Sequence, residues 1–159
     1  MKMTIISVGK LKEAYLNSGI EEYTKRLSKY TKLVFIEVKD EKAPESLSHK
    51  EQHQVKDVEG ERILTKIDKD AYVIALEPKG VSMTSEEFAN KIEDIKTYNS
   101  SHVIFIIGGS LGLSNQLRRH VNLELSFSKF TFPHQLMRLI LLEQIYRSFR
   151  ISNNEPYHK

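Results

Sequence analysis

Short apolar runs alternate with stretches of helical periodicity along this chain. Runs of β-branched and aromatic residues that are too short for helices are typical of strands in a sheet buried on both faces. Five such runs predict strands at Thr4–Val8, Lys32–Val38, Ala71–Leu76, His102–Ile107 and Leu123–Phe127. Because helical patterns separate them, we expect an α/β fold with a mostly parallel sheet flanked by helices. The length, 159 residues, fits one domain over residues 1–159.

The helices are predicted from apolar residues that recur every three or four positions. In the first helix, the residues with this spacing are Leu11, Tyr15, Leu16, Ile20, Tyr23 and Leu27. A charged helix follows over about Ser48 to Ile67, a third begins at the capping box Thr84-Ser85-Glu86-Glu87, and the last runs from Pro133 to about Ile151. Two segments are predicted as irregular: a turn at Glu77-Pro78-Lys79-Gly80 and a long or mobile loop at Asp40–Ser48.

Two loops that are poor in side chains follow the last two predicted strands. The first is Gly108-Gly109-Ser110-Leu111-Gly112, and the second is the Ser/Thr loop that leads to Pro133. In open parallel sheets, ligands bind beyond the carboxyl ends of the strands, where the strand order reverses. The loops after Leu76, Ile107 and Phe127 are therefore expected to converge and to offer backbone N–H and C=O groups to a small ligand. This arrangement favours a cofactor-binding enzyme.

The glycine segment by itself leaves two interpretations open. It lacks the Gly-x-Gly-x-x-Gly spacing of a dinucleotide site and the Gly-Lys-Ser/Thr ending of a P-loop. It fits a tight turn that requires a positive φ, and it fits close approach of the backbone to a ligand without phosphates.

One arginine falls on the apolar side of the last helix. At 100° per residue, Glu143, Arg147 and Arg150 share a polar face, whereas Arg138 lies within the apolar arc. A buried guanidinium needs an anionic or hydrogen-bonding partner. Arg138 therefore pairs with a carboxylate or reaches solvent, or it faces a cleft or a dimer interface. The wide apolar arc suits a helix buried against its own sheet and a second subunit.

Composition and charge narrow the class of protein. The chain has 24 Lys and Arg against 21 Asp and Glu, a formal charge of +3, which permits an anionic partner such as RNA without requiring one. Cysteine is absent, which excludes disulfides, thiol catalysis and Cys-based zinc sites. The first residues fit a strand better than a signal peptide, and no run approaches a membrane span. We therefore expect a cytoplasmic protein without a membrane partner.

The histidine pair and the C-terminal tail are less informative. His49 and His53 are four residues apart, but no Glu follows the first His as in His-Glu-x-x-His. A solvated helix face is favoured, and no metal is expected. The polar tail from Asn153 to Lys159 has the composition of a disordered terminus, although its aromatic and cationic groups also suit stacking on a base and contact with phosphate.

Several segments together resemble a known family. They are Val8-Gly9-Lys10-Leu11-Lys12, Tyr23-Thr24-Lys25-Arg26-Leu27, Gly80, residues 103–112 and 126–134, and Glu155-Pro156-Tyr157-His158-Lys159. Across essentially the whole chain, these segments are similar to the small bacterial pseudouridine N3-methyltransferases of large-subunit ribosomal RNA. That family belongs to the SPOUT, or α/β-knot, superfamily. The Phe-Pro-His-Gln-Leu-Met-Arg segment and the terminal Tyr-His are the most specific signals.

The resemblance implies a fold, a reaction and partners. The C-terminal segment would form a trefoil knot, which is an exception to the rule that chains are not knotted. The enzyme would be a homodimer that uses S-adenosyl-L-methionine to methylate N3 of pseudouridine 1915 in 23S rRNA of the assembled ribosome, without a metal. The family's pattern places the cofactor at Leu76, Gly108, Phe127, Ser128, Lys129, Phe130, Thr131 and Phe132.

The implied reaction needs help in removing a proton. The N3–H of the base is an imide with a pKa well above 7, so a general base or an anion-stabilising cation should help. The candidates are His134, Arg138, and Tyr157 and His158 reaching over from the tail. A helix N-terminus disfavours protonated histidine, so His134 is expected to be a neutral acceptor, unless its role is capping or structural. Arg138 would hold a substrate phosphate or stabilise the imide anion. Two other function classes compete with this methyltransferase: a nucleotide-utilising enzyme of the Rossmann type and a non-catalytic RNA- or ribosome-binding module.

Overall fold

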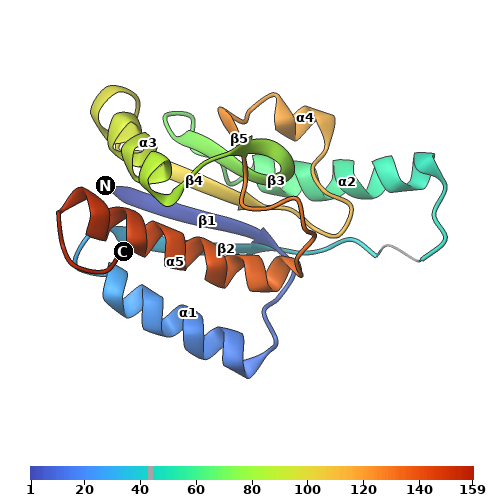
Figure 1. The fold of residues 1–159 in the computed structure, drawn as a ribbon. Coiled ribbons are helices and arrows are strands. Elements are labelled where there is room, and N and C mark those ends of the chain that lie inside the picture. The colour runs from blue at the N-terminus through green and yellow to red at the C-terminus, as the bar shows by residue number, and fades with distance from the viewer. Residues whose placement is uncertain (43–44) are drawn as a thin grey trace.

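The computed structural model describes residues 1–42 and 45–159. Its strands form one sheet in the order β2-β1-β4-β3-β5, with every neighbouring pair parallel (Figure 1). The strands are β1 (Lys2–Val8), β2 (Lys32–Val38), β3 (Tyr72–Ser82), β4 (His102–Ile107) and β5 (Leu123–Ser126). The five predicted strands and the parallel α/β sheet are confirmed.

Helices cover both faces of this sheet (Figure 1). One face carries α1 (Ala14–Leu27), α3 (Ser85–Tyr98) and α5 (His134–Ser152), and the other carries α2 (His49–Leu64) and the short α4 (Asn115–Arg118). In β4, Phe105 packs against the apolar side chains beneath α1, α3 and α5, whereas Ile104 and Ile106 pack against those beneath α2 and α4. Burial on both sides explains why β4 is apolar throughout. Within residues 1–42 and 45–159, none of the helices is long and apolar enough to cross a membrane.

Strand β3 corrects one prediction. The residues Glu77-Pro78-Lys79-Gly80, predicted as a turn, lie inside the strand. Leu76 and Val81 both pair with Leu125 of β5, and the residues between them form a bulge. Because β5 pairs with β3 on both sides of Pro78, the turn-forming composition produces a bulge instead of a chain reversal. The bulge lies at the carboxyl end of the sheet.

Helix boundaries agree with the predictions to within a few residues. The predicted capping box at Thr84 is present, and Ser48 caps α2 in the same way. Helix α2 ends at Leu64 instead of Ile67, and Pro133 precedes the first helical position of α5 instead of occupying it. The loop predicted at 40–48 contains residues 43–44, which lie outside the described residues, so its mobility stays a prediction.

The C-terminal tail, whose composition predicts disorder, is packed against α5. The Tyr157 ring meets the Tyr146 ring edge-on with 4.9 Å between centroids, and the Tyr157 hydroxyl donates a hydrogen bond of 3.1 Å to Glu143. Arg150 forms an ion pair with Glu155. The prediction of disorder was wrong because the composition of a polar segment does not reveal which partners α5 presents to it.

Candidate functional site

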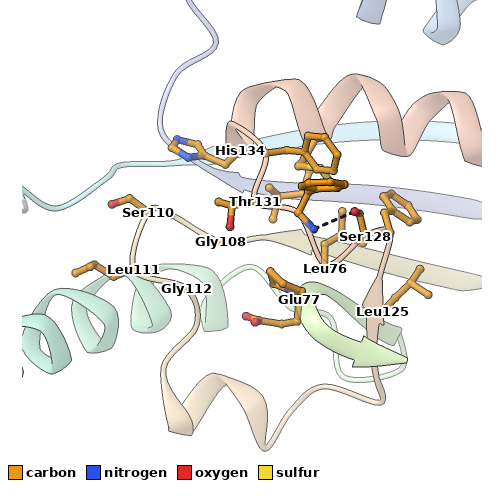
Figure 2. A pocket seen from close by; sticks show the side chains of 17 residues that line it. Leu76, Glu77, Gly108, Ser110, Leu111, Gly112, Leu125, Ser128, Thr131 and His134 are labelled. Carbon is orange, nitrogen blue, oxygen red and sulfur yellow. Dashed lines mark hydrogen bonds between the residues drawn. The ribbon is translucent and has the colours of Figure 1, made fainter. Parts of the chain in front are cut away.

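A cavity of about 450 Å³ opens beyond the carboxyl ends of β3, β4 and β5 (Figure 2). We call it the sheet-end pocket, and it is lined by Leu76, Glu77, Pro78, Ile107, Gly108, Gly109, Ser110, Leu111, Gly112, Leu125, Phe127, Ser128, Phe130, Thr131, Phe132, His134 and Met137. Its volume and largely apolar lining are typical of sites for small organic ligands. The predicted convergence of the three loops is confirmed.

The glycine segment after β4 forms one wall of the pocket, where Gly108, Gly109 and Gly112 present bare backbone beside the side chains of Ser110 and Leu111. Gly112 adopts a φ of +84°, and its N–H donates a hydrogen bond of 3.1 Å to the Gly109 carbonyl. A Cβ on Gly108 would lie 2.9 Å from Leu113 Cδ2, which is closer than packed atoms tolerate. The need for a positive φ is therefore confirmed at Gly112. At Gly108 a side chain would force Leu113 to shift, so packing within the protein favours glycine at this position.

The loop after β5 forms the opposite wall. The Ser126 hydroxyl lies within hydrogen-bonding distance of the Pro78 carbonyl at 3.0 Å and of the Ser128 carbonyl at 3.1 Å. The backbone N–H of Phe130 donates a hydrogen bond of 3.0 Å to the Ser128 hydroxyl, drawn as a dashed line in Figure 2. These bonds tie the loop to the bulge of β3. The Phe130 ring remains 79% exposed at the rim.

Most residues expected to hold a cofactor lie together in this pocket. Those that line it are Leu76, Gly108, Phe127, Ser128, Phe130, Thr131 and Phe132, whereas Lys129 does not. An adenosyl-methionine group needs an apolar slot with backbone donors and acceptors at its edges. The glycine segment after β4 (the glycine wall) and residues 127–132 after β5 (the serine loop) supply these features. The residues present therefore fit such a cofactor.

Sequence reasoning missed one charged residue of the pocket. The side chain of Glu77 is 11% exposed, and Arg118 Nη2 lies 3.4 Å from its Oε2. Burial raises the pKa of Glu77, and the positive charge of Arg118 opposes this effect. A usable signal was present, because Glu77 directly follows the predicted apolar strand Ala71–Leu76, and residues at such strand ends face the ligand site of parallel sheets.

His134 is the only predicted catalytic residue that lines the pocket in this chain. It is the first residue of α5. Burial lowers the pKa of His134, and the nearby Arg138 guanidinium lowers it further. The helix N-terminus acts in the same direction. The lowered pKa favours the neutral imidazole, whereas the role of His134 as proton acceptor stays a prediction.

Arg138 is engaged inside the fold. Its side chain is 5% exposed and donates hydrogen bonds of 2.6 Å to Glu37 Oε2 and 2.6 Å to the Gly9 carbonyl. Burial raises the pKa of Glu37, but the hydrogen bonds from Arg138 and from the Leu11 N–H outweigh this effect and lower it. Of the alternatives for Arg138, pairing with a carboxylate is the one that the structure shows.

Replacing Arg138 with methionine is expected to lower the free energy of unfolding by about 2 kcal/mol, as measured by urea denaturation. The Gly9 carbonyl loses its donor, whereas Glu37, with 43% of its side chain exposed, regains water. As a control, Lys96→Met on α3 removes an exposed partner of Glu93 and should change stability by less than about 0.5 kcal/mol. Equal stability of the two variants would contradict a structural role for Arg138.

The C-terminal tail, which carries Tyr157 and His158, follows the last residue of α5, whereas the pocket is lined by the first residue of this helix, His134; the C-terminus lies near the far end of α5 (Figure 1). A helix of 19 residues is about 28 Å long, so the tail does not reach the sheet-end pocket of its own chain. His158 instead pairs with Glu86 at 2.6 Å and contacts Arg147 at 3.2 Å. Burial raises the pKa of Tyr157. Within one chain, the four catalytic candidates do not meet at the sheet-end pocket: His134 and Arg138 lie in the first turns of α5, and Tyr157 and His158 lie beyond its last turn.

The histidine pair on α2 is exposed, which confirms the predicted solvated face for His49 and His53. In the part of the chain that the structure describes, no group of three or more His, Asp or Glu side chains is arranged to hold a metal ion.

Comparison with known proteins identifies the family of this chain. A family model described as "Predicted SPOUT methyltransferase" matches residues 1–158. The chain is 59% identical to the "Ribosomal RNA large subunit methyltransferase H" of Bacillus pumilus and 60% identical to that of Shouchella clausii, in each case over all 159 residues and the full length of both chains. An Exiguobacterium protein with the same name is 59% identical over its full length. The chain therefore belongs to the SPOUT methyltransferase family.

Proposed function

We propose that this protein is an S-adenosyl-L-methionine-dependent methyltransferase that methylates N3 of pseudouridine 1915 in 23S rRNA of the assembled ribosome. The observation that carries the proposal is the backbone-lined pocket at the ends of β3, β4 and β5, in a chain with full-length relatives named as methyltransferases of large-subunit ribosomal RNA.

In this proposal, the glycine wall and the serine loop hold the cofactor. Gly108 and Ser128 present the backbone of the two walls, and Leu76 and Phe127 supply apolar surface between them. When bound, the cofactor supplies an electrophilic methyl group. The protein's own part is to exclude water from the slot and to hold the base in line, since positioning supplies much of the acceleration in such transfers.

His134 is the proposed acceptor of the N3 proton. It lines the pocket, and its pKa is lowered by burial and by Arg138. A neutral imidazole can take up the proton as the nitrogen becomes nucleophilic. Arg138 acts in this scheme as a positioning residue, because its hydrogen bonds with Gly9 and Glu37 hold the loop after β1 beside the start of α5.

A second subunit completes the proposed site. Tyr157 and His158 are too far from their own pocket to act there, so we propose a homodimer in which each tail reaches the partner's pocket. The knotted C-terminal segment and a cytoplasmic location are further parts of the proposal, drawn from membership of the family.

Methyl transfer to ribosomes tests this function directly. Ribosomes from a strain that lacks the enzyme should take up a tritiated methyl group in 23S rRNA, at position 1915 by mass spectrometry of RNA fragments. Calorimetry should detect binding of S-adenosylmethionine but not of NAD, which separates the proposal from a Rossmann-type enzyme. Ribosome binding without methyl transfer would instead support a non-catalytic binding module and would contradict the proposal.

A further inference from the structure

The sheet-end pocket contains one carboxylate. Of the described residues that line it, Glu77 is the only acidic one and Lys and Arg are absent, while the lowered pKa of His134 favours its neutral form. Figure 2 shows the Glu77 side chain extending from β3 toward the glycine segment. The distance from Glu77 Oε1 to a Cβ built on Gly112 is 3.9 Å, so the carboxylate lies next to the bare backbone of that wall.

The charge of Glu77 is only partly balanced by its neighbours. Arg118 lies 3.4 Å from Glu77 but makes its shorter contact, 2.6 Å, with Glu124. One guanidinium thus serves two carboxylates, and 37% of its side chain is exposed to water. Lys56 of α2 is a more distant positive charge. The group formed by Glu77, Glu124 and Arg118 keeps a net negative charge beside the pocket.

We propose that Glu77 makes the pocket prefer the positively charged S-adenosylmethionine over its neutral product, S-adenosylhomocysteine. This inference rests on the proposed function. The two ligands share the adenosine and amino-acid groups and differ by one methyl group and one positive charge. A fixed carboxylate in a poorly hydrated slot therefore acts on the difference between them. Glu77 attracts the ground state of the cofactor, so its benefit is the exchange of product for fresh cofactor and not the transfer step.

Calorimetry at pH 8 with both ligands tests the proposal. Glu77→Gln keeps the shape of the side chain and removes its charge. We expect the dissociation constant of S-adenosylmethionine to rise about tenfold, while that of S-adenosylhomocysteine changes less than about twofold. Sinefungin, which carries an amine in place of the sulfonium, should follow S-adenosylmethionine. Glu93→Gln on α3 serves as the control, since it removes one exposed carboxylate that contacts Lys96. It should leave the ratio of the dissociation constants of S-adenosylmethionine and S-adenosylhomocysteine unchanged.

A second variant keeps the test decisive if Glu77→Gln does not fold. Arg118→Gln removes the opposing positive charge, so the preference for S-adenosylmethionine should rise a few-fold. This change is opposite to the fall in preference expected for Glu77→Gln. The inference is overturned if the ratio of the two dissociation constants stays the same in these variants, even where both affinities fall together. Failure of the unaltered protein to bind either ligand would instead overturn the proposed function, and the charge preference with it.

Discussion

Replacing Gly80 with alanine is expected to destroy the sheet-end pocket, and cofactor binding with it. A Cβ at this position would lie 2.6 Å from the carbonyl carbon and oxygen of Glu124 and 2.9 Å from the Leu125 nitrogen. All three are backbone atoms of β5, so no side-chain rotation relieves the overlap. The bulge of β3 would have to move away from β5, at a cost of about 3 kcal/mol or more. Leu76 and the loop after β5 would then separate.

Gly19→Ala on α1 is the matched control for this prediction, because Gly19 does not line the pocket. A Cβ there would lie 2.9 Å from Leu139 Cδ1, which is the end of a side chain that can rotate away, so stability should change by less than about 1 kcal/mol and cofactor binding should be unchanged. Urea denaturation followed by circular dichroism measures the stability of both variants, and calorimetry measures cofactor binding. A Gly80→Ala protein that binds normally and lies within about 1 kcal/mol of the original would refute close packing of the bulge on β5.

Mixing two inactive variants is expected to restore methyl transfer. His134→Ala removes the proposed acceptor and His158→Ala removes the tail group, and each should lower the turnover number about a hundredfold or more. In a mixed dimer, the His158→Ala chain keeps its pocket and the His134→Ala chain keeps its tail. One of the two sites is then complete, so random mixing should recover roughly a quarter of the sites.

The result of mixing distinguishes action across the dimer from action within one chain. If each tail served its own pocket, both sites of a mixed dimer would be defective and no activity would return. His49→Ala, which alters an exposed histidine on α2, should leave turnover unchanged in either partner. Absence of recovery, in a protein shown by light scattering to be dimeric, would contradict the proposed exchange of tails.

The fall of the turnover number at acid pH should reflect protonation of His134. Because burial and the Arg138 guanidinium lower the pKa of this residue, its neutral form persists below the usual histidine pKa of about 6.5. The turnover number should therefore stay constant as the pH falls from 8 to about 6.5 and should decline only below that value. A profile that already declines above pH 7 would exclude His134 as the acceptor.

Much of the candidate site was predictable because it depends on local properties of the chain. Apolar runs such as His102–Ile107 form strands buried on both faces, which commits the protein to a parallel sheet with helices on each side. Ligand sites in such sheets lie at the carboxyl ends. The glycine segment from Gly108 and the loop after Phe127 follow two of these strands, so their meeting in one pocket was expected.

Pairing between distant segments was not predictable in this way. Glu77-Pro78-Lys79-Gly80 has the composition of a turn, and only the pairing of β5 with both ends of β3 makes it a bulge. Arg138 meets Glu37, which is 101 residues away in sequence, and periodicity cannot specify such a partner. The tail is ordered by contact of Tyr157 with Tyr146 and Glu143, although its composition favours disorder.

The sequence alone determined the order of strands and helices, the backbone character of the loops and the end of the sheet where the pocket lies. Burial pattern and glycine content act over a few residues, so they can be read from neighbours in the chain. The tertiary structure alone decided which charges meet. It placed Glu77 and His134 in the pocket, turned Arg138 toward Glu37 and held His158 at the far end of α5. A charged side chain is stabilised by whichever partner folding brings within a few ångströms, and that partner comes from a distant segment.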